Sequence, residues 1–440
     1  MLDFRDELGP DQLAYLDLST ARNREAVPDG VVEIRGEPVA YVIDRASRPG
    51  GLSLSHIKKT ATLRGDAPYL VVLEPGQLTI YDATWGNGPE VTKLETVASA
   101  EGRAATTFQR LGLAFSREAA TGERGYLRNL LVRLLREAID TLVSEGLTPD
   151  DAVSLAGRVL FTRFLIDRNI ISGEHLSEIC PSADRAEHLF SGRDNTEATC
   201  RWLDMTFNGD LLPLSFSLQR GGFSRLKPEI FPALENILYR SPGGQLLLEW
   251  RDLDFAHIPV GLLSQVYERQ AQTWDPSGKR RESIYYTPHS IAEYMVQEVF
   301  AAMRESYPSP VHQARVLDPA AGGGVFLVAA FQELVAEWWR HQGRRPGTDE
   351  IRNILYHQIA GFEINESALR LAALSLYLKA IELDLAPHPP KKLRFAPLRG
   401  SVLYQCRLPH EIRAEVVAGS LGPAIGASHN QAYDVVIGNP

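Results

Sequence analysis

The chain has 440 residues, of which 44% are hydrophobic and 23% are charged. This composition is typical of a folded globular protein with room for roughly three domains, and it excludes a long disordered or fibrous chain. The amino terminus carries acids before any apolar run, and no apolar run approaches the ~20 residues of a membrane span. We therefore expect no membrane partner.

The cysteines and the net charge limit the site chemistry. Cys180, Cys200 and Cys406 are odd in number and lack C-x-x-C spacing, so neither a disulfide framework nor a thiolate zinc site is predicted, and a cytoplasmic location fits best. The formal net charge of -9 describes only the average field, so DNA stays open as a partner. For the basic clusters in 124–136, 279–281 and 340–345, a solvated helix or loop face is the favoured interpretation.

The first part of the chain has the pattern of short strands. The runs VVEI, PVAYVI, YLVVL and LTIYDA, within residues 31–83, are separated by turn signals and one basic segment. We expect a small α/β domain over residues 1–115.

The second part is helical. Residues 127–143 and 152–168 place apolar side chains three and four positions apart, as in amphipathic helices. Thr148-Pro149-Asp150-Asp151 is a helix start signal, with proline in the first turn and acids near the positive helix end. We expect a helical domain over residues 116–275.

The third part, residues 276–440, alternates strands with helices. Its runs VLDP, VFLVAAFQELVAEWW, IAGFEI, ESALRLAALSLYLKAIEL, RGSVLY and YDVVIG follow a β-α-β-α-β-β order. This order predicts a parallel sheet with crossover helices.

A glycine-rich turn follows the first of these strands. In residues 315–327 an apolar strand ends in Asp318, runs through Pro319, Ala320, Ala321 and three glycines, and opens a helix. Glycine allows a ligand to lie against bare backbone. The carboxylate disfavours a pyrophosphate and favours a cationic or amine-bearing ligand. The alternative is a tight strand-to-helix corner without a ligand.

A second acid ends the next strand. Glu363 precedes a helix start at Asn365-Glu366-Ser367, and an acid there can accept hydrogen bonds from both hydroxyls of a ribose. Together, Asp318 and Glu363 outline a nucleoside with a positively charged appendage. The alternative for Glu363 is an exposed charge at a helix N-terminus.

The third element of the site is the run that ends in Asn439-Pro440. Proline biases Asn439 toward an extended backbone, so that its amide and the neighbouring carbonyl can point into a pocket. These two groups can accept hydrogen bonds from an exocyclic amine. The alternative is that such a pattern arises here by accident.

Four motifs in this order resemble a known family. Tyr285-Tyr286-Thr287-Pro288, DPAAGGGVFL, GFEINESAL and DVVIGNP resemble the N6-adenine DNA methyltransferases of type I and type IIG restriction-modification and phage-defence systems. Runs in the helical part look like the linking region of these enzymes, so the resemblance covers about residues 124–440.

The resemblance implies S-adenosylmethionine as the cofactor. Thr287 and Tyr286 would hold its carboxylate, Asp318 its amine and Glu363 its ribose hydroxyls, with Pro319, Ala320, Gly322 and Gly324 forming the close backbone. Asn439 and Pro440 would receive the target adenine amine, flipped out of double-stranded DNA. The methyl group then transfers in line, a step that depends on positioning.

Several positions depart from the family pattern. Ala321 and Gly323 replace the usual Cys and Ser of the turn, and Ser401 stands where an acid or amide commonly holds the cofactor's adenine. The second proline and the aromatic residue of the catalytic loop are absent after Pro440, as are the later strands. We therefore expect a fragment or subunit that needs a complementing C-terminal half or a specificity or restriction subunit, and that is inactive alone.

The first part of the chain resembles, more faintly, a PD-(D/E)xK nuclease core. A metal site there would use Asp29 and Asp44, with a lysine two residues on to polarise water. That position is Ala46, although Lys58 or Lys59 could substitute. We favour a degenerate domain without nuclease activity; an unrelated small α/β domain is the alternative.

These interpretations define one expected architecture. It comprises a nuclease-like α/β domain, a helical linking domain and the first half of a Rossmann-like class I methyltransferase sheet. The expected function is site-specific DNA adenine N6-methylation in restriction-modification or antiviral defence, this chain being the cofactor-binding part. The alternative is a non-catalytic DNA-binding or scaffold subunit of a defence complex.

Overall fold

The computed structural model describes most of the chain in two compact units. The described residues are 1–21, 23–34, 36–48, 53–83, 92–98, 106–113, 126–207, 212–215, 222–238, 253–261, 287–306, 309–384, 394–406, 429 and 432–439. One unit comprises Met1–Leu131 with Ala256–Pro259, and the other Val132–Phe255 with Val260–Pro440. No helix within these described ranges is both long and apolar enough to cross a membrane.

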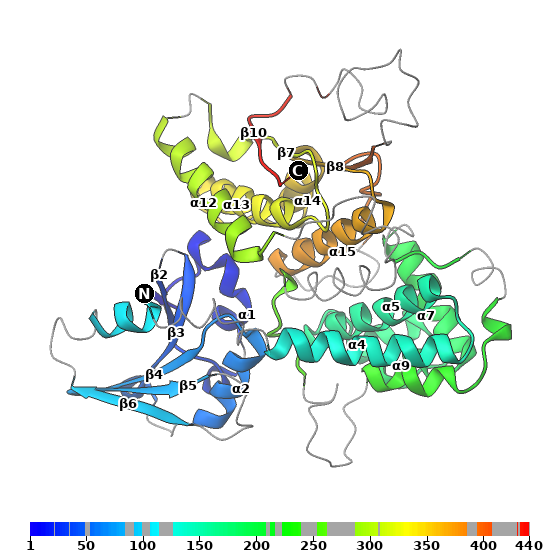
Figure 1. The fold of residues 1–440 in the computed structure, drawn as a ribbon, viewed down its shortest axis with the longest axis horizontal. Helices are drawn as coiled ribbons and strands as arrows, with labels where there is room; N and C mark the ends of the chain where they lie inside the picture. Colours follow the sequence, from blue (N-terminus) through cyan, green and yellow to red (C-terminus); the bar gives the residue numbers. More distant parts are fainter. Residues whose placement is uncertain are drawn as a thin grey trace. The chain divides into compact units, whose positions relative to one another are not determined.

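The first unit contains a mixed sheet of six strands in chain order (Figure 1). Only β3 and β4 are parallel, and helix α2 (Leu54–Arg64) provides the crossover between them. The predicted small α/β fold is present, but the strands predicted from the sequence did not include β1 and β6. The strands are β1 (Leu2–Asp3), β2 (Gly30–Ile34), β3 (Glu37–Asp44), β4 (Tyr69–Glu74), β5 (Gln77–Asp82) and β6 (Lys93–Ala98).

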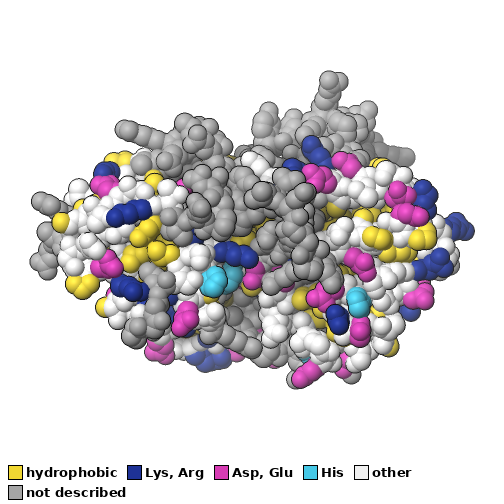
Figure 2. Space-filling view, turned by 90° about the horizontal axis from the view of Figure 1, so that it is seen from below, with side chains coloured by type: hydrophobic (Ala, Val, Ile, Leu, Met, Phe, Trp, Pro, Cys, Tyr) yellow, Lys and Arg dark blue, Asp and Glu magenta, His cyan; other side chains and the backbone are white. Residues whose placement is uncertain are grey.

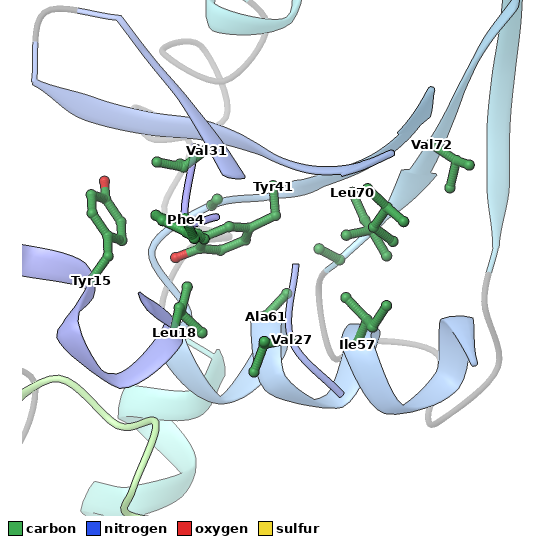
Figure 3. Close-up of a cluster of buried hydrophobic side chains, with 13 residues drawn as sticks. Phe4, Tyr15, Leu18, Val27, Val31, Tyr41, Ile57, Ala61, Leu70 and Val72 are labelled. Carbon is green, nitrogen blue, oxygen red and sulfur yellow. The ribbon is translucent and has the colours of Figure 1, made fainter. Parts of the chain in front are cut away.

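Side-chain alternation along the central strands builds a core on each face of this sheet. Leu70 and Val72 of β4 pack with Ile57 and Ala61 of α2, as Figure 3 shows. Short helix α1 (Leu16–Ser19) adds Leu18 to the same cluster. Val71 belongs to the cluster of the opposite face. Apolar burial on both faces explains why β3 and β4 are almost continuously hydrophobic.

The helical part of the second unit starts as the sequence predicts. Helices α4 (Tyr126–Ser144) and α5 (Pro149–Asp167) coincide with the two amphipathic runs. Thr148 is the N-cap of α5, since its hydroxyl accepts a hydrogen bond from the Asp151 N–H at 3.2 Å. The further helices are α6 (Leu176–Ile179), α7 (Arg193–Phe207) and α9 (Ile230–Leu238).

Helix α5 carries two arginines inside the protein. The Arg158 side chain is fully buried and donates hydrogen bonds to the carbonyls of Leu212 and Cys200 and to the Asp204 carboxylate. Arg163, 1% exposed, donates to the carbonyls of Ile237 and Leu253. Each guanidinium therefore joins α5 to another helix, α7 for Arg158 and α9 for Arg163, and to an irregular segment.

The second sheet is parallel, with strand order β10-β7-β8-β9. Helices α13 (Val325–Gln342) and α15 (Glu366–Leu383) contact its strands, as Figure 1 shows in yellow and orange. This parallel α/β arrangement confirms the predicted fold class. The strands are β7 (Val316–Asp318), β8 (Ile359–Glu363), β9 (Leu403–Gln405) and β10 (Val435–Val436).

Two helices of this part had no counterpart in the predicted elements. Helix α12 (His289–Ser306) begins after Pro288, and α14 (Thr348–His357) lies between α13 and β8, where no helix was predicted. Both starts carry ordinary signals, namely a proline before the first turn of α12 and the acids Asp349 and Glu350 in the first turn of α14.

We expect Arg158→Met to lower the free energy of unfolding of the second unit by about 3 kcal/mol or more, because two carbonyls and Asp204 lose their donor. Urea denaturation followed by far-UV circular dichroism measures the change. Arg201→Met is the control: Arg201 is 67% exposed and, among the described residues, pairs with Glu197 of its own helix, so its loss costs about 0.5 kcal/mol or less. Equal effects of the two substitutions would contradict the proposed role of Arg158.

Candidate functional site

The strand order of the second sheet reverses direction at β7. From β7 the chain moves to β8 and then β9 on one side, whereas β10 pairs with β7 on the other side. Ligands of open parallel sheets bind outside the carboxyl ends of the strands at such a reversal. Asp318 ends β7, Glu363 ends β8 and Asn439 follows β10, so the three predicted polar side chains belong to this edge.

Asp318 is completely buried, and only one of its two carboxylate oxygens has a hydrogen-bond partner among the described residues. Its Oδ1 accepts a hydrogen bond from the Ala320 N–H at 3.0 Å. Its Oδ2 is buried and has no hydrogen-bond partner among the described residues. A buried unpaired acceptor costs about 1–3 kcal/mol, and a ligand that donates to Oδ2 removes this cost.

The environment of Asp318 also changes its acidity. The pKa of this carboxyl is raised to about 7, mainly by burial and to a smaller extent by the Glu363 charge, while the hydrogen bond from the Ala320 N–H opposes the shift. The carboxyl is thus close to its midpoint of ionisation at neutral pH. A cation placed beside it would favour the carboxylate form.

Glu363 and the glycine-rich turn are joined directly. The Gly322 N–H donates to Oε2 of Glu363 at 2.7 Å, and the N–H groups of Ile364 and Asn365 donate to Oε1 at 2.8 Å. Asn365 caps α15 by accepting a hydrogen bond from the Ala368 N–H, as the helix-start signal predicts. Three N–H groups therefore fix the Glu363 carboxylate beside the turn that starts at Asp318.

Gly322 and Gly324 have different roles in the turn. Gly324 has a φ of +86°, and a Cβ there would approach the Ala372 Cβ to 3.0 Å, so this glycine lets α13 start against α15. Gly322 has a φ of +50°, and a Cβ there would meet nothing within 4 Å. Gly322 therefore leaves the space beside Glu363 open for a ligand.

The backbone after β10 approaches the same place. A Cβ on Gly438 would lie 2.5 Å from Oδ1 of Asp318, so only glycine allows this approach. The next residue, Asn439, donates a hydrogen bond from Nδ2 to Oγ1 of Thr287 at 3.2 Å. The structure thus brings together Asp318, Thr287 and Asn439. Tyr286 and Pro440, also predicted for this site, lie outside the described residues.

Ser401 is not brought to this edge. It lies in the turn that precedes β9, and its hydroxyl donates to the carbonyls of Pro397 and Leu398. Ile364, in contrast, was not singled out from the sequence. It follows Glu363 and keeps 38% of its surface exposed, which places an apolar side chain beside the acid. In the sequence, the position of Ile364 directly after the acid that ends a strand could have indicated that it belongs to the site.

The metal candidates Asp29 and Asp44 belong to the first unit. Asp29 precedes β2 and Asp44 ends β3, and the Asp44 N–H donates to Oδ2 of Asp29 at 2.9 Å. No group of three or more metal-type side chains occurs among the residues that were searched, which are those the structure describes.

The basic clusters are largely paired where they are described. Arg340 pairs with Glu333 and Glu337, and Arg344 with Glu350. On the face shown in Figure 2, basic and acidic side chains of the described residues lie interspersed. Charge alone therefore does not mark a nucleic-acid surface on this face. Lys279, Arg280 and Arg281 lie outside the described residues.

The fold and the site define a parallel α/β domain with a buried, half-paired acid at the carboxyl edge of its sheet. Residues 260–388 match the model of the family described as N-6 DNA Methylase. This match confirms the resemblance that the motifs predict, and it includes Thr287, Asp318, Gly322 and Glu363. A search of curated proteins finds no match.

The chain is also similar to solved restriction-modification proteins. The DrdV-DNA complex has 13% sequence identity and a TM-score of 0.37, and the match covers 94% of this chain and 38% of that one. The type IIG restriction endonuclease BpuSI has 13% identity and a TM-score of 0.32, with 82% of this chain and 37% of that one covered. A modification subunit of a putative type I restriction enzyme from Vibrio vulnificus YJ016 has 17% identity and a TM-score of 0.32, with 58% of this chain and 54% of that one covered. The chain thus spans between 37% and 54% of the length of these proteins.

We expect Asp318→Asn to stabilise the second unit increasingly as the pH rises. The raised pKa means that the stability contributed by Asp318 is fully present below pH 3.8 and falls as the pH approaches about 7. Asparagine lacks this charge, so the free energy of unfolding of the variant should gain roughly 2 kcal/mol on that of the wild type between pH 5 and pH 8.

Urea denaturation at the two pH values measures this difference. Glu298→Gln, an exposed site on α12, is the control and should leave the pH dependence unchanged. Parallel pH profiles of wild type and Asp318→Asn would show that Asp318 titrates normally.

Proposed function

We propose that this chain is the S-adenosylmethionine-binding part of a DNA adenine-N6 methyltransferase of a restriction-modification or phage-defence system. The observation that carries the proposal is the fully buried Asp318, whose Oδ2 lacks a donor at the reversal point of the parallel sheet. The family match over residues 260–388 supports the reaction class.

The side chains at this edge fit the proposed cofactor group by group. The Asp318 carboxylate would accept hydrogen bonds from the amine, and the Glu363 carboxylate from the ribose hydroxyls. Ile364 offers an apolar surface to a purine ring, and Thr287 with Tyr286 would hold the carboxylate. When bound, S-adenosylmethionine supplies an electrophilic methyl group on its sulfonium.

Asn439 is suited to orient the target amine. Because its Nδ2 donates to Oγ1 of Thr287, its Oδ1 must point elsewhere and can accept a hydrogen bond. An amide oxygen that accepts from the exocyclic amine of adenine holds the nitrogen in place and increases its electron density. The base must leave the duplex to reach this amide. Thr287 thus acts as a positioning residue for Asn439, and Pro440 remains the proposed second member of this pair.

The proposal includes the organisation predicted from the sequence. Residues 1–115 form the nuclease-like domain, 116–275 the helical linking domain and 276–440 the methyltransferase part. Double-stranded DNA and a complementing chain or subunit are the proposed partners.

Isothermal titration calorimetry with S-adenosylmethionine tests the binding site. Asp318→Asn should weaken binding at least tenfold, because it removes the charge that pairs with the amine. Since the cofactor requires ionised Asp318, whose pKa is about 7, binding to the wild type should tighten roughly eightfold between pH 6 and pH 7.5. Glu298→Gln is the matched control and should bind as the wild type does. Equal heats for wild type and Asp318→Asn would remove the pocket assignment.

Asn439→Ala separates binding from chemistry. In the assembly with the complementing chain, we expect this variant to lose methyl transfer to adenine by at least a hundredfold, while cofactor affinity stays within about twofold. Transfer of a tritiated methyl group to duplex DNA measures the reaction. Full activity of Asn439→Ala would exclude the proposed role of its amide.

A further inference from the structure

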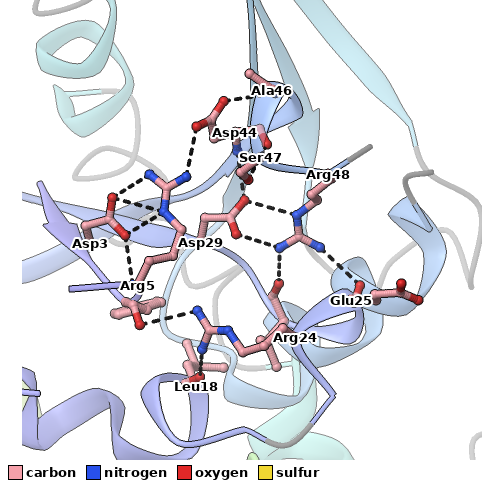
Figure 4. Close-up of polar contacts among 12 residues, drawn as sticks. Asp3, Arg5, Leu18, Arg24, Glu25, Asp29, Asp44, Ala46, Ser47 and Arg48 are labelled. Atoms are coloured by element: carbon pink, nitrogen blue, oxygen red, sulfur yellow. Dashed lines mark hydrogen bonds and ion pairs between the residues drawn. The ribbon is translucent and has the colours of Figure 1, made fainter. Parts of the chain in front are cut away.

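The nuclease-like acids of the first unit have a different environment from Asp318. Asp29 is 7% exposed and stands before β2, and Asp44 ends β3, where it is half-buried. Figure 4 shows that arginine side chains reach both carboxylates. Every one of their four carboxylate oxygens accepts a hydrogen bond from the protein itself.

Arg48 binds Asp29 in a bidentate geometry. Its Nε donates to Oδ2 at 3.0 Å and its Nη2 to Oδ1 at 2.9 Å, and both side chains are only 9% exposed. The same guanidinium donates to the carbonyls of Val27 and Glu25. Four acceptors therefore fix the position of the Arg48 guanidinium. Asp29 also accepts a hydrogen bond from the Asp44 N–H.

Arg5 occupies the corresponding place beside Asp44. Its Nη1 donates to Oδ2 of Asp44 at 2.9 Å, while its Nε and Nη2 bind Asp3. Oδ1 of Asp44 accepts from the Ala46 N–H, so the position where a nuclease would carry lysine supplies only a backbone group. The Asp3 and Asp44 carboxylates raise the pKa of Arg5, which keeps this guanidinium charged.

The charges in this cluster already balance. Arg5 and Arg48 pair with Asp3, Asp44 and Asp29, and Arg24 lies within electrostatic range of Asp3 and Asp29, so the formal charge of these six side chains is zero. A divalent cation needs several uncompensated oxygen ligands, and here it would have to displace charged donors that are held by other bonds. These residues therefore do not fit a catalytic metal ion.

We infer that the guanidinium groups of Arg5 and Arg48 take the place of a divalent cation between Asp29 and Asp44, so that the first unit folds without metal and does not cleave DNA. The acid pair keeps a structural function, because it joins the start of β2 to the end of β3 and to the segment that follows.

Manganese binding to the full chain tests this inference. In the wild type we expect no stoichiometric binding of Mn²⁺ at about 1 mM, measured from the electron paramagnetic resonance signal of the free ion, and no nicking of plasmid DNA with Mn²⁺ or Mg²⁺. Binding or nicking that Asp29→Asn abolishes would overturn the inference.

Removing a guanidinium provides the complementary measurement. Arg48→Met should lower the melting temperature of the first unit by roughly 10 °C or more, and Mn²⁺ should restore part of that loss. Arg5→Met, whose ion pairs are partly exposed, gives the same readout with a smaller loss. Arg45→Met, at an exposed neighbouring arginine, should change neither the melting temperature nor the response to Mn²⁺. If Mn²⁺ stabilises neither Arg48→Met nor Arg5→Met, the arginines do not stand in for a cation.

Discussion

The proposed site depends on one physical constraint: the carboxylate of Asp318, at the end of β7, is buried. Removing Asp318 from water is unfavourable, and its Oδ1 recovers only one backbone hydrogen bond. The close approach of Gly438 and the fixed position of Glu363 prevent the chain from relaxing around this side chain. The fold therefore keeps an acceptor ready for a donor that the described residues do not provide.

The environments of the buried acids differ between the two units. In the first unit, Asp29 and Asp44 are satisfied by arginines of the same chain, and their charges are compensated. In the second unit, no described arginine or lysine pairs with Asp318, and its pKa rises to about 7. The presence or absence of an internal guanidinium thus separates a structural acid pair from the proposed ligand site, although both begin as an acid at a strand end.

Arginine has a similar structural use inside the helical part of the second unit. Arg158 and Arg163 lie on the buried side of α5, and their planar groups donate to carbonyls of helices α7 and α9 and to those of Leu212 and Leu253, which belong to no helix or strand. Hydrophobic periodicity does not account for them, because a charged residue within an apolar run is normally assigned to solvent. Their role became visible only with their partners, which lie 42 to 90 residues further along the chain.

The sequence by itself determined the elements whose signals are local. Strands β7 and β8, the glycine-rich turn and the caps Thr148 and Asn365 follow from apolar runs, backbone freedom and short-range hydrogen bonds. Only the tertiary structure decided which side chains meet. The contact of Asn439 with Thr287, 152 residues apart, depends on the order of four parallel strands, and the arginine partners of Asp29 and Asp44 depend on how β2 and β3 pair. Local patterns cannot specify these contacts, because they arise from packing between segments distant in the chain.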